Sequence, residues 1–191
     1  LGEGGIRPLA IDYLQGLRRL CDQHAWLLIF DEVQTGNGRC GSTYVFEQLG
    51  VEPDVLLTAK GLGNGLPIGV CMAKGVAAEQ LGPGDHGSTF GGNPLACNIA
   101  MASLEVIRDE KLAENAEAMG QLTRKNLNAM NSPLVSVVRG KGLLNAIVIK
   151  PFKNNAGREM TAWDVCLAFA KNGLLAKPTH DDIIRLAPPL V

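Results

Sequence analysis

The sequence of 191 residues is poor in aromatic residues and has almost no net charge. It contains two Trp, two Tyr and five Phe, and its 18 Lys and Arg nearly balance its 19 Asp and Glu. A nucleic-acid partner would require an excess of positive charge, which is missing. Apolar stretches such as residues 26–30 are far shorter than the roughly 20 residues that cross a bilayer. We therefore expect a globular chain without a nucleic-acid or membrane partner.

The sequence also lacks paired cysteines and metal-ligand spacings. The five cysteines are odd in number, and no two of them form a CxxC pair. This favours buried thiols in a reducing compartment over a disulfide framework or a zinc site, with a single reactive cysteine as the alternative. The compartment would be the cytoplasm, or the mitochondrial matrix in a eukaryote. The three histidines are far apart in the sequence, and we expect no metal site.

The amino end of the chain shows neither a methionine nor a signal-peptide pattern. Leu1 opens the sequence, and no charged stretch followed by an apolar core stands near it. We therefore expect a fragment or a processed form.

The first part of the chain alternates strand and helix patterns. Continuous apolar runs, typical of strands buried on both faces, lie at residues 26–33, 54–59 and 68–73. Helical spacing of apolar residues predicts helices at 11–24 and 94–108, with a short helix at 45–49. Residues 1 to about 111 are thus predicted to form an α/β unit with a mainly parallel sheet.

The later part of the chain has a different pattern of predicted helices and strands. The helical register continues through residues 110–130. Strands are then predicted at 134–138, 143–149, 174–176 and 183–186, and a helix at 161–171. Arg139 and Lys141 are interpreted as supports of a turn, with carboxylate binding by Arg139 as an alternative. Residues 112–191 are predicted to form a smaller α+β unit.

Two charged residues stand where predicted strands end. Asp31 ends the first apolar run, and Lys60 ends the second. Ligands of parallel sheets bind at the carboxyl ends of the strands, so this pair is a candidate site. A buried ion pair or two solvent-facing loop charges remain the structural alternative.

A glycine-rich loop offers a second, weaker motif. Residues 36–41 read Gly-Asn-Gly-Arg-Cys-Gly and match the dinucleotide pattern G-x-G-x-x-G, with Asp54 at about the distance of its ribose-binding acid. However, Asp54 begins a predicted strand instead of ending one. The dinucleotide interpretation is therefore disfavoured.

Three sequence blocks carry a family resemblance. They are Phe-Asp-Glu-Val-Gln-Thr-Gly at 30–36, Ala-Lys-Gly at 59–61 and Gly-Ser-Thr-Phe-Gly-Gly-Asn-Pro at 87–94. In order and spacing they resemble the signature blocks of class III aminotransferases, above all acetylornithine and ornithine aminotransferases. The resemblance covers essentially the whole chain. It implies the fold-type-I (aspartate aminotransferase-like) α/β fold, with residues 1–111 in the cofactor-binding large domain and 112–191 in an incomplete small domain.

The resemblance also implies pyridoxal phosphate as the cofactor. Lys60 resembles the lysine whose amine attaches to the cofactor and later moves a proton. Asp31 resembles the acid that keeps the pyridine nitrogen protonated. Val33 would pack on the ring, and Gln34 would approach the phenolic oxygen.

Further roles follow from the same resemblance. Ser88 and Thr89 resemble the segment that reaches the cofactor phosphate of the neighbouring subunit, which implies a homodimer. Arg185 resembles a bidentate clamp for a substrate carboxylate, and Glu3 the acid that masks this arginine. A structural salt bridge for Arg185 and an ordinary loop charge for Glu3 are the alternatives.

The expected reaction is transfer of the distal amino group of ornithine or N-acetylornithine to 2-oxoglutarate. The alternatives are another ω-aminotransferase, such as one for 4-aminobutyrate, or an inactive truncated module. Family members carry an earlier segment with the phosphate-cupping helix start and much of the substrate pocket, so the chain is expected to hold part of the active site. Cys40 replaces the threonine usual in the family, which affects the hydrogen bonding expected of that loop.

Overall fold

The computed structural model describes residues 1–191, which divide into two compact units. The Lys60 unit comprises Leu9–Glu114, and the Arg185 unit comprises Leu1–Pro8 together with Asn115–Val191. Residues 1–8 thus pack with the later part of the chain. No helix combines the length and the apolar character that a membrane crossing requires.

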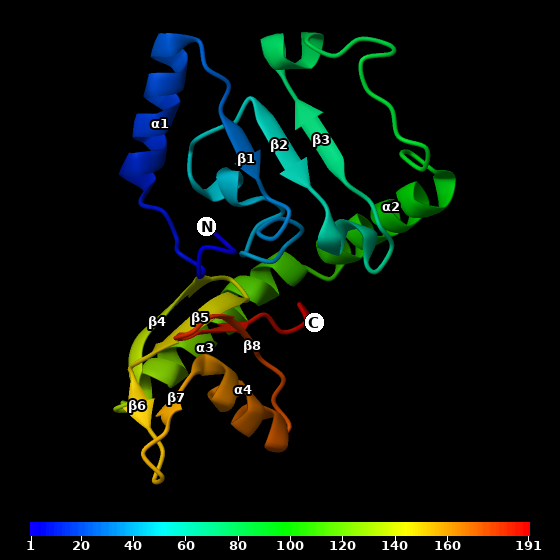
Figure 1. Ribbon diagram of the computed structural model, residues 1–191. Coiled ribbons are helices and arrows are strands. Elements are labelled where there is room, and N and C mark those ends of the chain that lie inside the picture. Colours follow the sequence, from blue (N-terminus) through cyan, green and yellow to red (C-terminus); the bar gives the residue numbers. More distant parts are fainter. The chain divides into compact units, whose positions relative to one another are not determined.

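The Lys60 unit is built on a three-stranded sheet, which confirms the α/β class. The strands are β1 (Ile29–Asp31), β2 (Val55–Thr58) and β3 (Val70–Ala73), in the order β1-β2-β3 (Figure 1). Strands β1 and β2 are parallel, whereas β2 and β3 are antiparallel. The expected mainly parallel sheet is therefore wrong for β3. A parallel return needs a crossover of a dozen or more residues, usually helical, and the turn-rich link before β3 supplies none.

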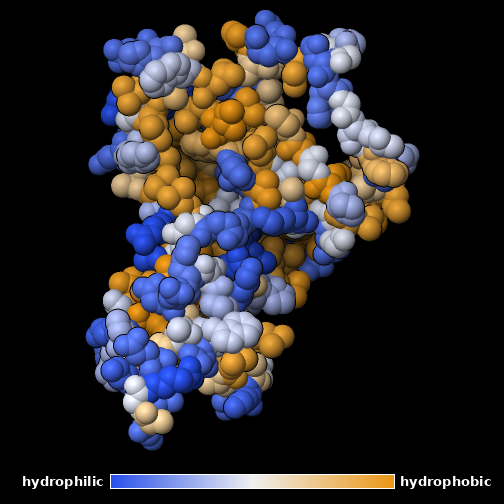
Figure 2. All heavy atoms as spheres, in the orientation of Figure 1, coloured by the Kyte–Doolittle hydropathy of each residue, from blue (hydrophilic) through white to orange (hydrophobic).

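One face of this sheet is exposed, contrary to the expected burial on both faces. Helix α1 (Ile11–His24), which has the predicted bounds, buries Leu14 and Cys21 against Leu28. Side chains alternate along a strand, so Ile29 points away from this cluster and is 53% exposed. All residues of β3 are exposed as well. Figure 2 shows hydrophobic residues at the surface of this unit.

Helix caps set the limits of the long helices. Asn93 accepts a hydrogen bond from the Ala96 amide at 2.9 Å, and proline follows it at the start of α2 (Pro94–Asp109). Lys111 then has a left-handed φ of 53°, so α3 begins only at Leu112 and runs to Ala129. The predicted continuous register at 110–111 is broken there. Short 3-10 helices lie at Val45–Gln48, Lys60–Gly63 and Gly75–Glu79.

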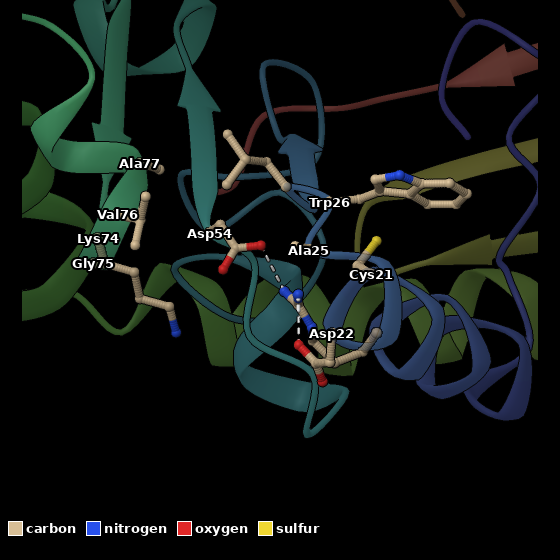
Figure 3. Close-up of a pocket in the computed structure, with 11 residues that line it drawn as sticks. Cys21, Asp22, Ala25, Trp26, Asp54, Lys74, Gly75, Val76 and Ala77 are labelled. Atoms are coloured by element: carbon tan, nitrogen blue, oxygen red, sulfur yellow. Dashed lines mark hydrogen bonds and ion pairs between the residues drawn. The ribbon is translucent and has the colours of Figure 1, made fainter.

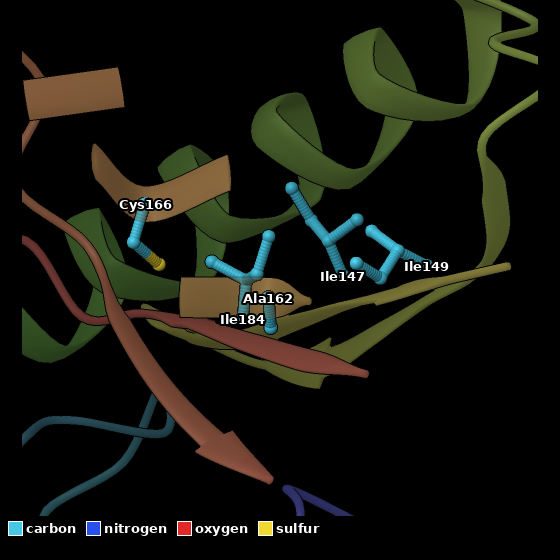
Figure 4. Packing of buried hydrophobic residues seen from close by; sticks show 5 residues of the cluster. All are labelled: Ile147, Ile149, Ala162, Cys166 and Ile184. Carbon is cyan, nitrogen blue, oxygen red and sulfur yellow. The ribbon is translucent and has the colours of Figure 1, made fainter. Parts of the chain in front are cut away.

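The Arg185 unit is an antiparallel sheet covered by helices on one face. Its strands, in spatial order, are β4 (Val135–Lys141), β5 (Leu144–Ile149), β9 (Ile183–Leu186) and β8 (Lys177–His180). Helix α4 (Ala162–Lys171) buries Ala162 and Cys166 against Ile147, Ile149 and Ile184 (Figure 4).

Strand β9 has its predicted bounds. The strand predicted at 174–176 is wrong, because the chain pairs with β9 only from Lys177 onward. The hairpin of β6 (Phe152–Lys153) and β7 (Glu159–Met160) was not predicted.

Helix α3 approaches the β4–β5 turn at Gly120. A Cβ atom at this position would lie 1.8 Å from the carbonyl oxygen of Gly142. Arg124, one turn later, donates hydrogen bonds to the same oxygen at 3.0 Å and to Oδ1 of buried Asn145 at 2.8 Å. The glycine therefore permits a helix-to-turn contact that any side chain would block.

We expect Gly120→Ala to lower the free energy of unfolding of this unit by about 3 kcal/mol, the upper range for overpacking, because a backbone atom must move. Gly16→Ala in α1 is the matched control. Its added Cβ meets only the far end of Arg19, at 3.9 Å, and helix propensity should stabilise it by up to about 1 kcal/mol. Urea unfolding followed by circular dichroism measures both. Equal effects of the two substitutions would contradict the close approach at Gly120.

The start of α4 is held by an ionised carboxylate. Asp164 Oδ1 accepts a hydrogen bond from Arg158 at 2.8 Å, and its Oδ2 accepts from the Thr161 amide at 2.9 Å. The Arg158 guanidinium, followed by the Thr161 amide, lowers the pKa of Asp164 to about 2. A carboxyl group with a lowered folded-state pKa stabilises the fold above its unfolded pKa of about 3.9.

We therefore expect Asp164 to stabilise the Arg185 unit fully above about pH 4 and to lose this effect as the pH falls toward 2. Asp164→Asn should flatten the dependence of the thermal unfolding midpoint on pH in this window. Other carboxyl groups titrate in the same range, so the difference between variant and parent is the quantity to measure. Parallel curves for the two proteins would show that Asp164 contributes nothing.

Candidate active site

Lys60 and Asp31 lie at the same edge of the three-stranded sheet. Asp31 is the last residue of β1 and pairs in register with Leu57 of β2. Lys60 follows Leu57 by three positions and begins a 3-10 helix. Because β1 and β2 are parallel, their carboxyl ends meet at one edge, where α/β sheets bind ligands. Both side chains are exposed, so an amine and a carboxylate are accessible there.

The backbone at Lys60 is strained. Its φ of 47° places a non-glycine residue in the left-handed region, directly after the extended Ala59. Such a conformation costs about 1 kcal/mol or more, and residues of this kind cluster at functional sites. The strain therefore supports a functional interpretation of Lys60 over an ordinary loop lysine.

A buried asparagine supports the strand end that precedes Lys60. Asn37 donates from Nδ2 to the Thr58 hydroxyl at 3.0 Å and to the Ala59 carbonyl at 3.2 Å. Thr58 and Asn37 are both buried. Sequence reasoning missed Asn37, since it stands between two loop glycines and its burial has no local signal. It fixes the two residues on which the position of Lys60 depends.

Glu32, the neighbour of Asp31, has a different role. Its buried carboxylate accepts hydrogen bonds from the Thr35 hydroxyl at 2.9 Å and from the amides of Val45 and Phe46 at 2.8 and 3.0 Å. The alternation of a strand turns Glu32 inward and Asp31 outward. Glu32 therefore ties the loop after β1 to the following 3-10 helix, whereas the Asp31 side chain is exposed.

The remaining predicted residues of the Lys60 unit lie in its loops. Val33 and Gln34 are half-buried in the turn after β1, where the Val33 amide donates to Asp31 Oδ1 at 3.0 Å. Ser88 and Thr89 lie in the exposed loop that leads into α2. Cys40 is buried, and its carbonyl oxygen accepts a hydrogen bond from Gln48 at 3.2 Å.

In the Arg185 unit, the structure brings Arg185 and Glu3 together. Their side chains form an ion pair at 3.5 Å, in which Arg185 is 21% and Glu3 71% exposed. Arg139 does not support the turn but donates to the carbonyl oxygens of Gly5 and Ile6. Lys141 instead approaches Glu117 at 3.4 Å. These contacts do not support the alternative that Arg139 binds a carboxylate, since its Nε and Nη2 donate to backbone carbonyl oxygens.

A cavity of about 430 Å³ lies away from the candidate site, at the end of the sheet where β1 and β2 begin (Figure 3). Three of its charged residues pair with one another: Arg18 bridges Asp22 and Asp54, each at 2.8 Å. Asp54 also accepts from the Leu28 amide at 2.7 Å, and this bond, followed by that from Arg18, lowers its pKa. Asp54 is therefore a structural residue, which removes the support for a dinucleotide site.

Comparison with known proteins places these features in a family. Residues 1–191 match the family model described as Aminotransferase class-III. The ornithine aminotransferase of Emericella nidulans is 50% identical over 191 residues, which are 100% of this chain and 41% of that protein. The mitochondrial ornithine aminotransferase of Rattus norvegicus is also 50% identical, over 100% of this chain and 42% of its own length.

Solved structures show the same fold. The acetylornithine aminotransferase of Elizabethkingia anophelis matches with a TM-score of 0.90 and 46% identity, over 100% of this chain and 47% of its own. The ornithine aminotransferase of Toxoplasma gondii, described with partial occupancy of PLP at its active site, matches with a TM-score of 0.90 and 40% identity, over 99% of this chain and 44% of its own. The chain thus spans less than half the length of these relatives.

Proposed function

The chain belongs to the class-III aminotransferases, and from this premise we propose that its protein transfers the distal amino group of ornithine or N-acetylornithine to 2-oxoglutarate, with pyridoxal phosphate held at Lys60. The family is dependent on pyridoxal phosphate, and the fold is that of fold-type-I enzymes of this kind. The observation that carries the proposal is the placement of Asp31 and Lys60 at the neighbouring carboxyl ends of two parallel strands.

The donor set at this edge fits the cofactor. Lys60 offers an accessible amine for an aldehyde, and Asp31 an accessible carboxylate for a protonated ring nitrogen. When bound, pyridoxal phosphate supplies an electron sink for the substrate carbon that loses a proton. The Lys60 amine would hold the cofactor and, once free, carry that proton. Asp31 Oδ1 is engaged by the Val33 amide, and the exposed side chain would present Oδ2 to the ring.

Other residues complete the proposed site. Val33 would pack on the ring face, and Gln34 would approach the phenolic oxygen. Ser88 and Thr89 would bind the cofactor phosphate of a second subunit in a homodimer, which suits their place in an exposed loop. In this proposal residues 1–111 are part of the cofactor-binding large domain, and residues 112–191 are part of the small domain.

The Arg185–Glu3 pair is proposed to bind substrate carboxylates in turn. Arg185 would bind the α-carboxylate of 2-oxoglutarate with two parallel hydrogen bonds. When the amino donor presents its distal amine, Glu3 would occupy Arg185 instead. The long contact of 3.5 Å and the exposure of Glu3 suit a carboxylate that is released in each cycle.

We expect Arg185→Lys to slow the half-reaction with 2-oxoglutarate by roughly ten- to a hundredfold, which corresponds to about 1.5–3 kcal/mol for a charge-assisted bond. A lysine is a point charge and does not reproduce the bidentate geometry. The half-reaction with ornithine should change far less. Single-turnover kinetics with each substrate measures the two rates. Equal slowing of both would make Arg185 a structural residue.

The proposed compartment is a reducing one, either the cytoplasm or the mitochondrial matrix. All five cysteines are free thiols in the structure. The ornithine aminotransferases of the rat and of Drosophila melanogaster carry the word mitochondrial in their names.

The function is tested with the protein as its gene encodes it. Borohydride reduction after addition of pyridoxal phosphate, followed by peptide mapping, should place the adduct on Lys60. Glutamate should then form from 2-oxoglutarate with ornithine or N-acetylornithine, and more slowly with 4-aminobutyrate. An adduct on another lysine would sink the assignment of Lys60. An adduct on Lys60 without any amino transfer would favour an inactive module.

A further inference from the structure

We propose that Arg139 is a positioning residue for amine selectivity, because it holds the backbone that carries Glu3 within reach of Arg185. The inference rests on the proposed roles of Glu3 and Arg185 and deepens them. It starts from the face of the four-stranded sheet on which these residues lie.

Arg139 and Arg185 share the face of the sheet that points away from α4. Ile147 and Ile184 pack on α4 residues, so the residues next to them in β5 and β9 point the other way. Arg139 pairs with Ala146, and Ala146 pairs with Arg185. Directly paired residues lie on one face. Ala146 is nevertheless fully buried, which shows that this face is covered.

The segment Leu1–Pro8 lies against this face, and Arg139 holds it by hydrogen bonds. Arg139 Nε donates to the carbonyl oxygens of Gly5 and Ile6 at 3.1 and 2.9 Å, and its Nη2 donates to Gly5 at 2.7 Å. Bonds from a charged donor are about twice as strong as neutral ones. A single side chain of β4 thus holds two consecutive peptide groups close to Glu3.

Two further contacts restrict the same segment. His180 Nε2 donates to the carbonyl oxygen of Glu3 at 3.2 Å. Gly5 has a φ of 89°, and a Cβ there would lie only 2.7 Å from Ile183 Cδ1 and 3.3 Å from Arg139 Nη2. These contacts restrict how the segment lies against the sheet, and Arg139 donates three hydrogen bonds to it.

The Glu3 side chain is largely exposed. It is 71% exposed, and its contact with Arg185 is 3.5 Å long. Ion pairs with this exposure contribute little by themselves, because solvent screens them and the side chain loses entropy. Competition between Glu3 and a substrate carboxylate must therefore depend on how well the backbone of Glu3 is placed beforehand.

The position of Glu3 matters because positive charge is concentrated around Arg185. Lys177 lies directly opposite Arg185 in register, so two cations are neighbours on this face. If Glu3 moved away, Arg185 would become more accessible to any substrate carboxylate. The enzyme would then accept α-amines more readily, and Arg139 would be the residue that prevents it.

The test compares Arg139→Gln with Arg139→Lys and with Lys141→Gln as the matched control. Lys141 lies in the same strand but approaches Glu117 of α3 instead of the segment. Arg139→Gln should lower the ratio of kcat/KM for ornithine over an α-amine donor such as alanine by about tenfold. Arg139→Lys should lower it less, and Lys141→Gln should leave it unchanged. In a Glu3→Ala background, Arg139→Gln should have little additional effect, since both act through one carboxylate.

Hydrogen exchange supplies a readout that needs no activity. The amides of Gly5 and Ile6 bond to the Gly2 carbonyl, and that of Arg7 to the Leu1 carbonyl. A peptide covering residues 1–7 should exchange faster in Arg139→Gln than in the parent or in Lys141→Gln. Unchanged exchange would overturn the positioning role. Faster exchange with unchanged selectivity would overturn its link to Glu3. If the parent transfers no amino group, the proposed function fails, and exchange still decides whether Arg139 holds the segment.

Discussion

Replacing Lys60 by alanine should lower the rate of amino transfer by about four orders of magnitude. General acid–base catalysis alone contributes up to about 10⁴-fold, and the variant also loses the covalent attachment of the cofactor. The loss corresponds to about 5.4 kcal/mol of barrier at about 1.36 kcal/mol for each factor of ten. The measurement is glutamate formation from ornithine and 2-oxoglutarate with saturating pyridoxal phosphate.

Lys74 provides the matched control for this substitution. It follows β3, at the opposite end of the sheet from Lys60, and pairs with Glu52 in an exposed salt bridge. Lys74→Ala should therefore leave the rate unchanged. Small amines in solution should partly restore Lys60→Ala, because they can carry the proton that the missing amine moved. A fully active Lys60→Ala protein would remove the basis of the proposed function.

Asp31→Asn should lower amino transfer by about a thousandfold, or about 4 kcal/mol of barrier. An amide does not stabilise a protonated ring nitrogen, so the electron sink that the substrate carbon needs becomes weaker. The cofactor should still attach to Lys60. The Val33 amide, which donates to Asp31 Oδ1 at 3.0 Å, can donate equally to the oxygen of the introduced amide, so the turn and the unfolding midpoint should be preserved.

Glu32→Gln is the informative comparison, because it changes the adjacent carboxylate to an amide. Glu32 accepts three hydrogen bonds in the interior, and the amide nitrogen would confront at least one donor. This variant should lose about 1–3 kcal/mol of its free energy of unfolding. The catalytic rate of the protein that remains folded should change much less than in Asp31→Asn. If Asp31→Asn and Glu32→Gln behaved alike, the outward and inward roles of the two carboxylates would be wrong.

Local patterns predicted the helices better than they predicted the sheets. Helix α1 was predicted with its bounds because apolar spacing is a local signal. Strand β8 was misplaced, because its polar residues form a strand only through pairing with β9. Burial of the first sheet on both faces was predicted wrongly, since an apolar run does not show which elements cover it.

The candidate site shows the same division. Asp31 and Lys60 were found because each follows an apolar run, and parallel pairing brings their ends together. Asn37 was not predicted, because its role is to hydrogen-bond residues 58–59 from a buried position, which has no local sequence signal. The contacts of Arg139 with Gly5 and Ile6 escaped notice as well, because they join positions far apart in the sequence. Sequence reasoning thus singled out the two residues at the strand ends and missed residues that hydrogen-bond to the neighbouring backbone.

The grouping of Leu1–Pro8 with Asn115–Val191 has a consequence for the order of events during synthesis. Within this chain the residues of the Lys60 unit, Leu9–Glu114, follow one another, and translation delivers them at about 5–20 residues per second. The segment with Glu3 emerges from the ribosome before that unit, yet its partners in β4, β8 and β9 emerge after it. Until these strands have been made, the segment has no partners to pack against. Its later contact with them closes a loop of more than 100 residues, which costs conformational entropy. The part of the molecule proposed to choose among amines therefore assembles after the Lys60 unit, and slow translation would prolong the time without it.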